Sequence, residues 1–237
     1  MKAFVIFRRE LMGYFLSPIA WVVAVVTAIV MARFFENFSL LRSRATLEGV
    51  FGASAYWLFL TIPALTMGSL ASEFRNGTIE VLATDPVKDW EIIVGKFLGT
   101  LAYFVFCLIP LPVFYLILRY LGGNPDTGPI MTGSLALLLG GAFSIAIGIF
   151  ASALTSQQIV SYLVAALILF VLRQVGETEP LDIPDWLRSV FGYLSMPKHL
   201  SGMIHGRIGS DDIIYFVATT VLFLFLATRI LESRRWA

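Results

Sequence analysis

The charged residues that could contact another protein gather in one stretch between two long apolar runs. This stretch, "ASEFRNGTIEVLATDPVKDWEIIVGK" at residues 71–96, carries five acidic and three basic side chains. Mixed charges of this density form ion pairs, and a charged rim sets the register of a contact with a partner protein. Two interpretations follow from the residues: a cytoplasmic docking element for a soluble partner, or a solvated loop.

The same stretch contains residues that end and begin helices. Gly77 can end a helix, because glycine tolerates the left-handed conformation. Thr78 can cap a following short helix that has Glu80 in its first turn, where an acid suits the helix dipole. Asp85 and Pro86 then suit the N-cap and the first position of a third helix. The sequence therefore predicts helix, break, short helix, break and helix.

Small and polar residues in and beside the apolar runs form two further sets. The first set recurs at every fourth position, as in helices that approach closely, and it leaves open packing within one subunit or between subunits. Its members are Gly140, Ser144, Gly148 and Ser152. The second set either lines a translocation path or bonds to neighbouring helices. Its members are Thr61, Thr66, Ser69, Gln157 and Ser161.

Sulfur and imidazole groups cluster near residue 200. They belong to Met196, His199, Met203 and His205. Such ligands would suit copper, and ordinary loop residues are the other interpretation. Catalytic motifs are missing from the sequence: there is no HExxH, and Gly95-Lys96 lacks both the upstream glycine and the following Ser or Thr of a P-loop. We therefore expect no enzyme activity, metal or cofactor in this chain itself.

The composition indicates an all-α integral membrane protein. Of 237 residues, 58% are hydrophobic and 14% are charged, against about 45–50% and 25% in soluble domains. A spanning helix needs roughly 20 mostly apolar residues, and lipid offers backbone groups no partner outside the helix. We predict one transmembrane domain, residues 1–237, with six spanning helices. They cover residues 18–35, 50–71, 97–118, 129–154, 158–172 and 212–230.

No acidic or basic residue falls in the middle of these six ranges. Charges at that depth usually mark ion or proton pathways, so their absence speaks against a proton-coupled carrier and favours a lipid-like cargo over an ion. The net charge of +1 gives no basic footprint for nucleic acid, so we expect none as a partner.

The segments outside the predicted spans have patterns of their own. Residues 1–17 place four apolar side chains on one helical face, which predicts an interfacial helix. Residues 173–211 form a long outer loop, in which residues 186–194 repeat apolar side chains at helical spacing. This repeat predicts an amphipathic helix that lies at the outer interface or re-enters the membrane.

Basic residues in the two short tails predict the orientation of the chain. They are Lys2, Arg8, Arg9, Arg229, Arg234 and Arg235. Short basic flanks stay on the cytoplasmic side, whereas long loops cross largely regardless of charge. We therefore place both termini, and with them segment 72–96, in the cytoplasm.

Two stretches are similar to permeases of the type-II ABC exporter family. "EFRNGTIEVLATDPVKDWEIIVGKFLG" resembles the loop after their second span, where a charge cluster, Gly-Thr, an acid, Pro and Gly-Lys follow one another. "RRELMGYFLSPIAW" resembles the start of these permeases. Within the family, the chain is most similar to the gliding-motility permeases.

The resemblance implies the permease subunit of an ATP-driven exporter in a bacterial inner membrane. Its coupling helix, about residues 78–83, would sit in a groove of a separate dimeric ATPase, and ATP and Mg²⁺ would bind only in that partner. A second copy or a sister permease would complete the dimer. The docking residues would be Glu73, Arg75, Gly77, Thr78, Glu80, Asp85 and Pro86. A non-transporting mechanotransmission scaffold with the same kind of ATPase and a passive channel are the alternatives.

Overall fold

The computed structural model describes residues 2–41, 45–77, 88–175 and 185–235. All secondary-structure elements in these ranges are helices, which confirms the all-α prediction. The helices are α1 (Lys2–Leu16), α2 (Pro18–Phe35), the π-helix η1 (Glu36–Leu40), α3 (Glu48–Thr66), α4 (Ala71–Asn76), α6 (Asp89–Cys107), α7 (Pro110–Tyr120), α8 (Thr127–Leu154), α9 (Gln158–Gln174), α10 (Asp185–Leu194), α11 (Met196–Ile204) and α12 (Ser210–Arg235).

Five stretches among the described residues are long and apolar enough to cross a membrane. They are Pro18–Leu40, Glu48–Asn76, Asp89–Tyr120, Thr127–Leu154 and Ser210–Arg234. The apolar helix α9 has 17 residues, which is about 25 Å at 1.5 Å per residue, against a hydrocarbon core of about 30 Å. The chain is therefore a multi-pass membrane protein, and a sixth crossing by α9 stays a prediction.

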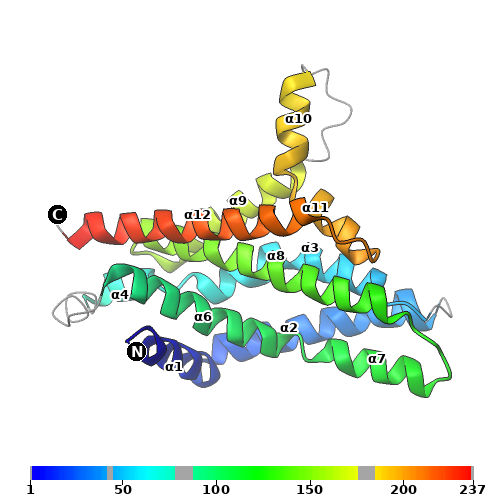
Figure 1. The fold of residues 1–237 in the computed structure, drawn as a ribbon. Coiled ribbons are helices and arrows are strands. Elements are labelled where there is room, and N and C mark those ends of the chain that lie inside the picture. Colours follow the sequence, from blue (N-terminus) through cyan, green and yellow to red (C-terminus); the bar gives the residue numbers. More distant parts are fainter. Residues whose placement is uncertain (1, 42–44, 78–87, 176–184, 236–237) are drawn as a thin grey trace.

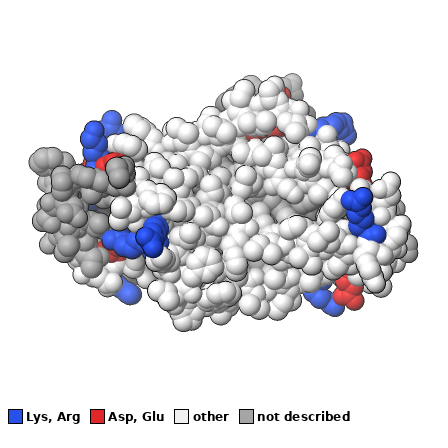
Figure 2. All heavy atoms as spheres, turned by 60° about the horizontal axis from the view of Figure 1, so that its bottom comes forward, with Lys and Arg blue, Asp and Glu red and all other residues white. Residues whose placement is uncertain are grey.

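The distribution of charge agrees with a membrane location. On the face that Figure 2 shows, Lys, Arg, Asp and Glu gather at the two ends of the bundle, and a broad band of other residues separates them. Large apolar side chains along the helices are exposed, among them Val22, Ile29 and Leu116. Extended exposed apolar surface marks contact with lipid or protein, and lipid would cover these side chains in a bilayer.

The second and third predicted spans are interrupted in the structure. α3 ends at Thr66, and α4 begins at Ala71 after a turn. The third stretch is divided into α6 and α7 just before Pro110, which has no N–H to continue the helical hydrogen bonds. α6 begins at Asp89, between the predicted first helical position at Pro86 and the predicted span start at residue 97, so that Lys96 lies inside the helix. Its start is fixed by Glu91, whose Oε2 accepts the Lys88 N–H at 3.0 Å.

α8 forms the centre of the bundle (Figure 1). In its most apolar window 67% of the residues are buried, against 17% in the corresponding window of α12. Glycines on α8 admit large neighbours: an added Cβ at Gly133 would collide with the Phe51 ring, and one at Gly141 with the Phe104 ring. α3 and α6 therefore pack directly against the α8 backbone.

Both chain termini lie at one end of the bundle, together with α1, α4 and the start of α6 (Figure 1). We call this the terminal end and the opposite one the far end. The segment before α12 contains two helices. α10 covers the residues for which the sequence predicts an amphipathic helix and projects from the bundle, whereas α11 lies against it with Met196, Leu200 and Met203 buried.

Candidate functional site

Lys96 is a buried cation in the half of α6 that lies near the terminal end. Its side chain is 1% exposed. Nζ lies 2.7 Å from the Ser69 carbonyl oxygen, 2.9 Å from Glu73 Oε1 and 3.3 Å from Glu10 Oε2. An ammonium group has three N–H donors, so each of them finds an acceptor. Two of the acceptors are carboxylates, which balance a charge that would be costly to bury alone.

Two glycines on α6 let α1 approach closely enough for this contact. An added Cβ at Gly95 would lie 2.8 Å from Cβ of Ile6, and one at Gly99 would lie 2.8 Å from Cβ of Glu10. Residues four apart share a face of a helix, so the two glycines form one smooth strip beside Lys96. Close packing of the two helices thereby brings the Glu10 carboxylate within reach of the cation.

Glu73 extends the contact to α4. Its Oε1 also lies 3.3 Å from Arg9 Nη2, so one carboxylate oxygen contacts cations from two helices. The two carboxylates of Glu10 and Glu73 match the two cations of Arg9 and Lys96, which makes the group formally neutral. We call these four side chains, with the Ser69 carbonyl, the Lys96 network. It joins α1, α4 and α6 at one point.

A second polar contact holds α1 one turn further along. The Tyr14 hydroxyl lies 3.1 Å from the Leu65 carbonyl oxygen and 2.9 Å from Thr100 Oγ1. Burial, with Glu10 as the second cause, raises the pKa of Tyr14 far above its usual value. The cause is that burial disfavours the charged form of the hydroxyl. α1 is thus tied to both α3 and α6.

The predicted docking residues divide into those that the structure describes and those that it does not. Glu73 faces the Lys96 network and its side chain is 15% exposed. Arg75 is exposed, and Gly77 ends α4 in the left-handed conformation with φ of 68°. Four predicted docking residues, and with them the short coupling helix, lie outside the described residues. They are Thr78, Glu80, Asp85 and Pro86.

Two of the predicted path residues border different cavities. Ser69 borders a cavity of about 320 Å³ beside the Lys96 network, and Thr61 borders a much smaller space. Thr66 and Ser161 are buried, and Gln157 is exposed. The two threonine hydroxyls each donate to a carbonyl of their own helix at 3.0 Å.

The regularly spaced small residues of α8 contact other parts of this same chain. Gly140 lies next to Leu200 of α11, and the Ser144 hydroxyl donates to the Gly140 carbonyl at 2.7 Å. Gly148 leaves room for the Thr66 side chain, with which an added Cβ would collide.

Ser152, the last of these residues, bonds to the turn between α3 and α4. Its Oγ accepts the N–H groups of Leu70 and Ala71, both at 2.9 Å, and lies 3.3 Å from the Met67 carbonyl oxygen. Backbone groups in a lipid environment need such partners where a helix is interrupted. One hydroxyl on α8 therefore stabilises the turn that sets the direction of α4.

The two histidines are bonded to protein groups. His199 Nδ1 lies 2.7 Å from Asp212 Oδ1 and Nε2 lies 2.9 Å from the Tyr193 carbonyl oxygen, while the ring stacks on Tyr215 at 4.2 Å. His205, directly after α11, donates from Nδ1 to the Ser201 carbonyl of that helix. Both nitrogens of His199 are occupied, and the described residues contain no group of three His, Cys, Asp or Glu that could hold a metal ion.

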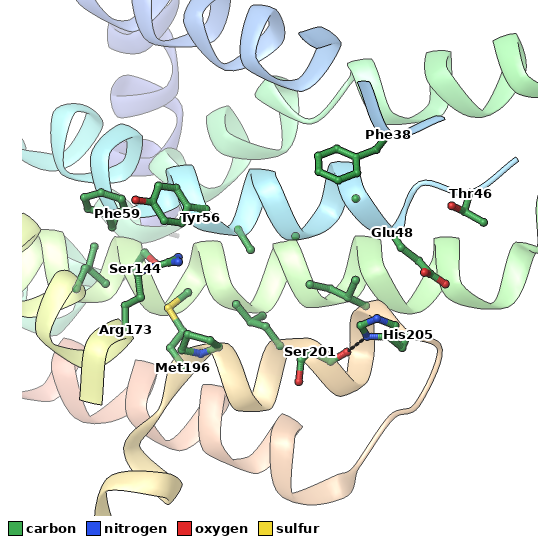
Figure 3. A pocket seen from close by; sticks show the side chains of 17 residues that line it. Phe38, Thr46, Glu48, Tyr56, Phe59, Ser144, Arg173, Met196, Ser201 and His205 are labelled. Carbon is green, nitrogen blue, oxygen red and sulfur yellow. Dashed lines mark hydrogen bonds between the residues drawn. The ribbon is translucent and has the colours of Figure 1, made fainter. Parts of the chain in front are cut away.

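A larger cavity, of about 440 Å³, lies between η1, α3, α8, α9 and α11 (Figure 3). We call it the outer cavity. Glu48 and His205 lie at one end of it, and Tyr56 and Arg173 at the other. The Arg173 guanidinium carbon is 3.8 Å from the centre of the Tyr56 ring. Arg173 takes part in none of the ion pairs between described residues.

Sequence reasoning missed two members of the Lys96 network, Arg9 and Glu10, and the position of Arg173. The sequence places Arg9 and Glu10 in a predicted interfacial helix and predicts no ion pair for either. The signal for that contact was the spacing of Gly95 and Gly99, since small residues four apart allow close helix approach. Arg173 follows the predicted fifth span directly, and only the arrangement of α3 and α9 places it on Tyr56.

The fold and the site together define a class of protein: a helical, multi-pass membrane protein with a charged network at the end that carries both termini. The comparison with known families narrows this class. The family described as "ABC-2 family transporter protein" matches residues 35–229, and the chain belongs to it. No curated protein matches the chain. Membership makes the chain a permease subunit of an ABC transporter, whose partner is an ABC ATPase subunit.

Proposed function

We propose that this chain couples ATP hydrolysis by a separate cytoplasmic ATPase to export of a substrate across a bacterial inner membrane. Two permeases, either identical or sister subunits, work with two ATPases. Both termini are cytoplasmic, six helices span the membrane, and ATP and Mg²⁺ bind in the partner. Within the family, the motifs of the first hundred residues favour the gliding-motility permeases.

The Lys96 network is the observation that carries this proposal. α4 lies in the predicted docking segment just before the predicted coupling helix, and Glu73 of α4 contacts Lys96 of α6 and Arg9 of α1. A displacement of α4 by the ATPase is passed to these two helices, because separating buried opposite charges costs several kcal/mol, about 3–5 when one partner is removed.

The positions of the termini support the orientation. An even number of crossings brings both termini to one side, and both lie at the end that carries α4 (Figure 1). A C-terminal tag is therefore expected to resist external protease in intact cells and to be digested after the cells are opened. Digestion in intact cells would invert the orientation.

The coupling role is tested with the chain co-expressed with its ABC ATPase subunit. Glu73→Gln removes the charge that holds α4, so we expect the ATPase to co-purify while ATP-driven transport in sealed vesicles falls at least tenfold. Glu80→Lys reverses a charge of the docking segment, and we expect it to reduce co-purification itself. Glu232→Gln, at an exposed acid near the same end, is the matched control.

Three outcomes separate the proposal from its alternatives. Wild-type chain without any ABC ATPase at near-stoichiometric amounts contradicts the proposal and favours a passive channel. ATP turnover that depends on the permease, without movement of any cargo, favours the mechanotransmission scaffold. Unchanged transport in Glu73→Gln would show that the Lys96 network does not pass the movement of α4 to the other helices.

A further inference from the structure

The outer cavity combines a cation with an apolar wall. Its volume of about 440 Å³ falls in the range of roughly 300–1,000 Å³ that is usual for small-molecule sites. Its apolar lining includes Phe38, Phe59, Leu169, Met196 and Leu200. Its cationic group is Arg173, which extends from α9 toward Tyr56 of α3 (Figure 3).

Arg173 contacts α3 inside the second long apolar stretch, Glu48–Asn76. Tyr56, on which its guanidinium stacks, is eight residues from Glu48 at the start of α3, which is about 12 Å along a helix. α9 is shorter than the hydrocarbon core, and Arg173 is in its last turn. Ionisable groups within the membrane region usually serve a function and have a partner.

The described residues supply only part of the contacts that Arg173 can make. A guanidinium group has five N–H donors, and the aromatic face of Tyr56 contacts its plane without accepting those bonds. Among the described residues, no carboxylate pairs with it. An anion with two oxygens fits the edge of the group in a bidentate manner.

We propose that the outer cavity binds an amphiphile with one anionic head group, which Arg173 contacts, and an apolar tail, which lies along the aromatic and aliphatic wall. The Glu48 carboxylate at the other end of the cavity disfavours a second anionic group. This binding requires only the permease chain, so it goes beyond the proposed function and does not depend on the ATPase.

Gly52 provides a way to close the cavity without disturbing the fold. It lines the cavity from α3, and an added Cβ would meet no atom within 4 Å. A large side chain at this position therefore enters empty space, whereas one at Gly49 would collide with the Phe38 ring.

The proposal is tested on the purified full-length chain in nanodiscs of phosphatidylcholine. Dioctanoyl phosphatidylglycerol is titrated and its binding is measured by native mass spectrometry. Dioctanoyl phosphatidylcholine, with equal tails, and inorganic phosphate are the matched probes. We expect phosphatidylglycerol to bind at least tenfold more tightly than either.

Variants test the cationic group and the apolar wall of the cavity separately. Arg173→Gln should weaken phosphatidylglycerol binding about tenfold, since hydrogen bonds to charged groups are lost, and Arg173→Lys should retain part of it. Gly52→Phe should abolish binding while the melting temperature is unchanged. Arg119→Gln is the control, because Arg119 also lies in the last turn of a helix at the far end but does not line the cavity.

Several results would overturn the proposal. Equal affinities of Arg173→Gln and wild type would exclude the guanidinium as the anion site. Full binding in Gly52→Phe would place the lipid elsewhere, and phosphate binding as tight as phosphatidylglycerol would exclude a role of the apolar wall.

Experiments on the complex with the ATPase distinguish two sources of the amphiphile, an exported substrate and a resident membrane lipid. An exported substrate raises ATP turnover when the lipid is added, and Arg173→Gln removes this increase. A resident membrane lipid binds with the same dependence on Arg173 and leaves ATP turnover constant. Both results support the binding site. If no ATPase co-purifies with the chain, that result contradicts only the proposed function, because lipid binding is measured on the chain alone.

Discussion

Lys96 near the terminal end and Arg173 toward the far end are both cations in a bundle built for lipid, and the chain surrounds them differently. Lys96 is 1% exposed, with all three N–H donors directed at oxygen atoms of the protein. Arg173 lies on an aromatic face, beside a cavity. The first environment is complete without a ligand, whereas the second has hydrogen-bond donors for which the described residues offer no carboxylate.

This difference indicates what each region can do. A saturated cation makes its three helices move together, which suits transmission of force from a partner protein. A cation with unused donors beside an apolar wall suits recognition. The two tasks are placed at opposite ends of the membrane-spanning bundle, and α8, the most buried of its spanning stretches, lies between them.

The largest effect expected from this comparison is the loss of Lys96. Lys96→Met leaves the Glu10 and Glu73 carboxylates without their shared cation, so we expect the free energy of unfolding to fall by about 3–5 kcal/mol. The measurement is thermal unfolding of the purified chain in detergent. Lys88→Met, at an exposed lysine just before the same helix, is the control and should change little.

A variant in which Lys96 and both carboxylates are replaced by neutral side chains tests whether charge causes this loss of stability. If the loss in Lys96→Met comes from unpaired carboxylates, adding Glu10→Gln and Glu73→Gln should restore part of the stability, because replacing a whole buried ion group costs less than breaking it. A triple variant less stable than Lys96→Met alone would show that packing, and not charge, dominates at this site.

A smaller effect is expected from the glycine strip that brings α1 to α6. Gly99→Leu forces a side chain into the position of Cβ of Glu10, and overpacking of this kind costs about 1–3 kcal/mol. Thermal unfolding should show this loss, and a cysteine pair across the two helices should cross-link less. Gly13→Leu on α1, where an added Cβ meets nothing within 4 Å, should leave both readouts unchanged.

These contacts mark how far the sequence alone could lead. Helix positions followed from apolar runs and capping residues: α2 begins at Pro18 and α9 at Gln158, as the sequence predicts. The turn before α4 did not follow, because it depends on a tertiary partner. Ser152 of α8 supplies hydrogen bonds for the turn, and no local pattern records that contact across about eighty residues.

The candidate site shows the same limit. Glu73 and Lys96 were visible in the motif, but their pairing depends on the turn, and the contact of Glu10 depends on the glycine strip. Hydropathy places Arg173 directly after the fifth predicted span. Its contact with Tyr56 depends on how α3 and α9 pack, which hydropathy does not give. The sequence therefore shows which residues are charged, whereas the partners of these charges depend on how the helices pack.

Ser152 tests how an uncharged group compares with the Lys96 network. Ser152→Ala leaves the N–H groups of Leu70 and Ala71 without their acceptor, and an unsatisfied buried donor costs about 1–3 kcal/mol. Ser144→Ala is the matched control, because its hydroxyl bonds only to a carbonyl of its own helix. Equal losses of stability in the two variants would show that the turn does not need this acceptor.

Arg173→Gln is expected to have the smallest effect on stability. Its contact within the described residues is the Tyr56 face, and a cation–aromatic contact contributes about 0.5–1 kcal/mol at a partly exposed site. Removing a desolvated charge offsets part of that loss, so the melting temperature in detergent without added lipid should change by no more than the error of the measurement. With dioctanoyl phosphatidylglycerol present, wild type should gain stability and the variant should not, because only wild type binds the lipid and ligand binding stabilises the folded state. A loss as large as that of Lys96→Met, with or without lipid, would make Arg173 a second structural cation and remove the contrast between the two ends of the bundle.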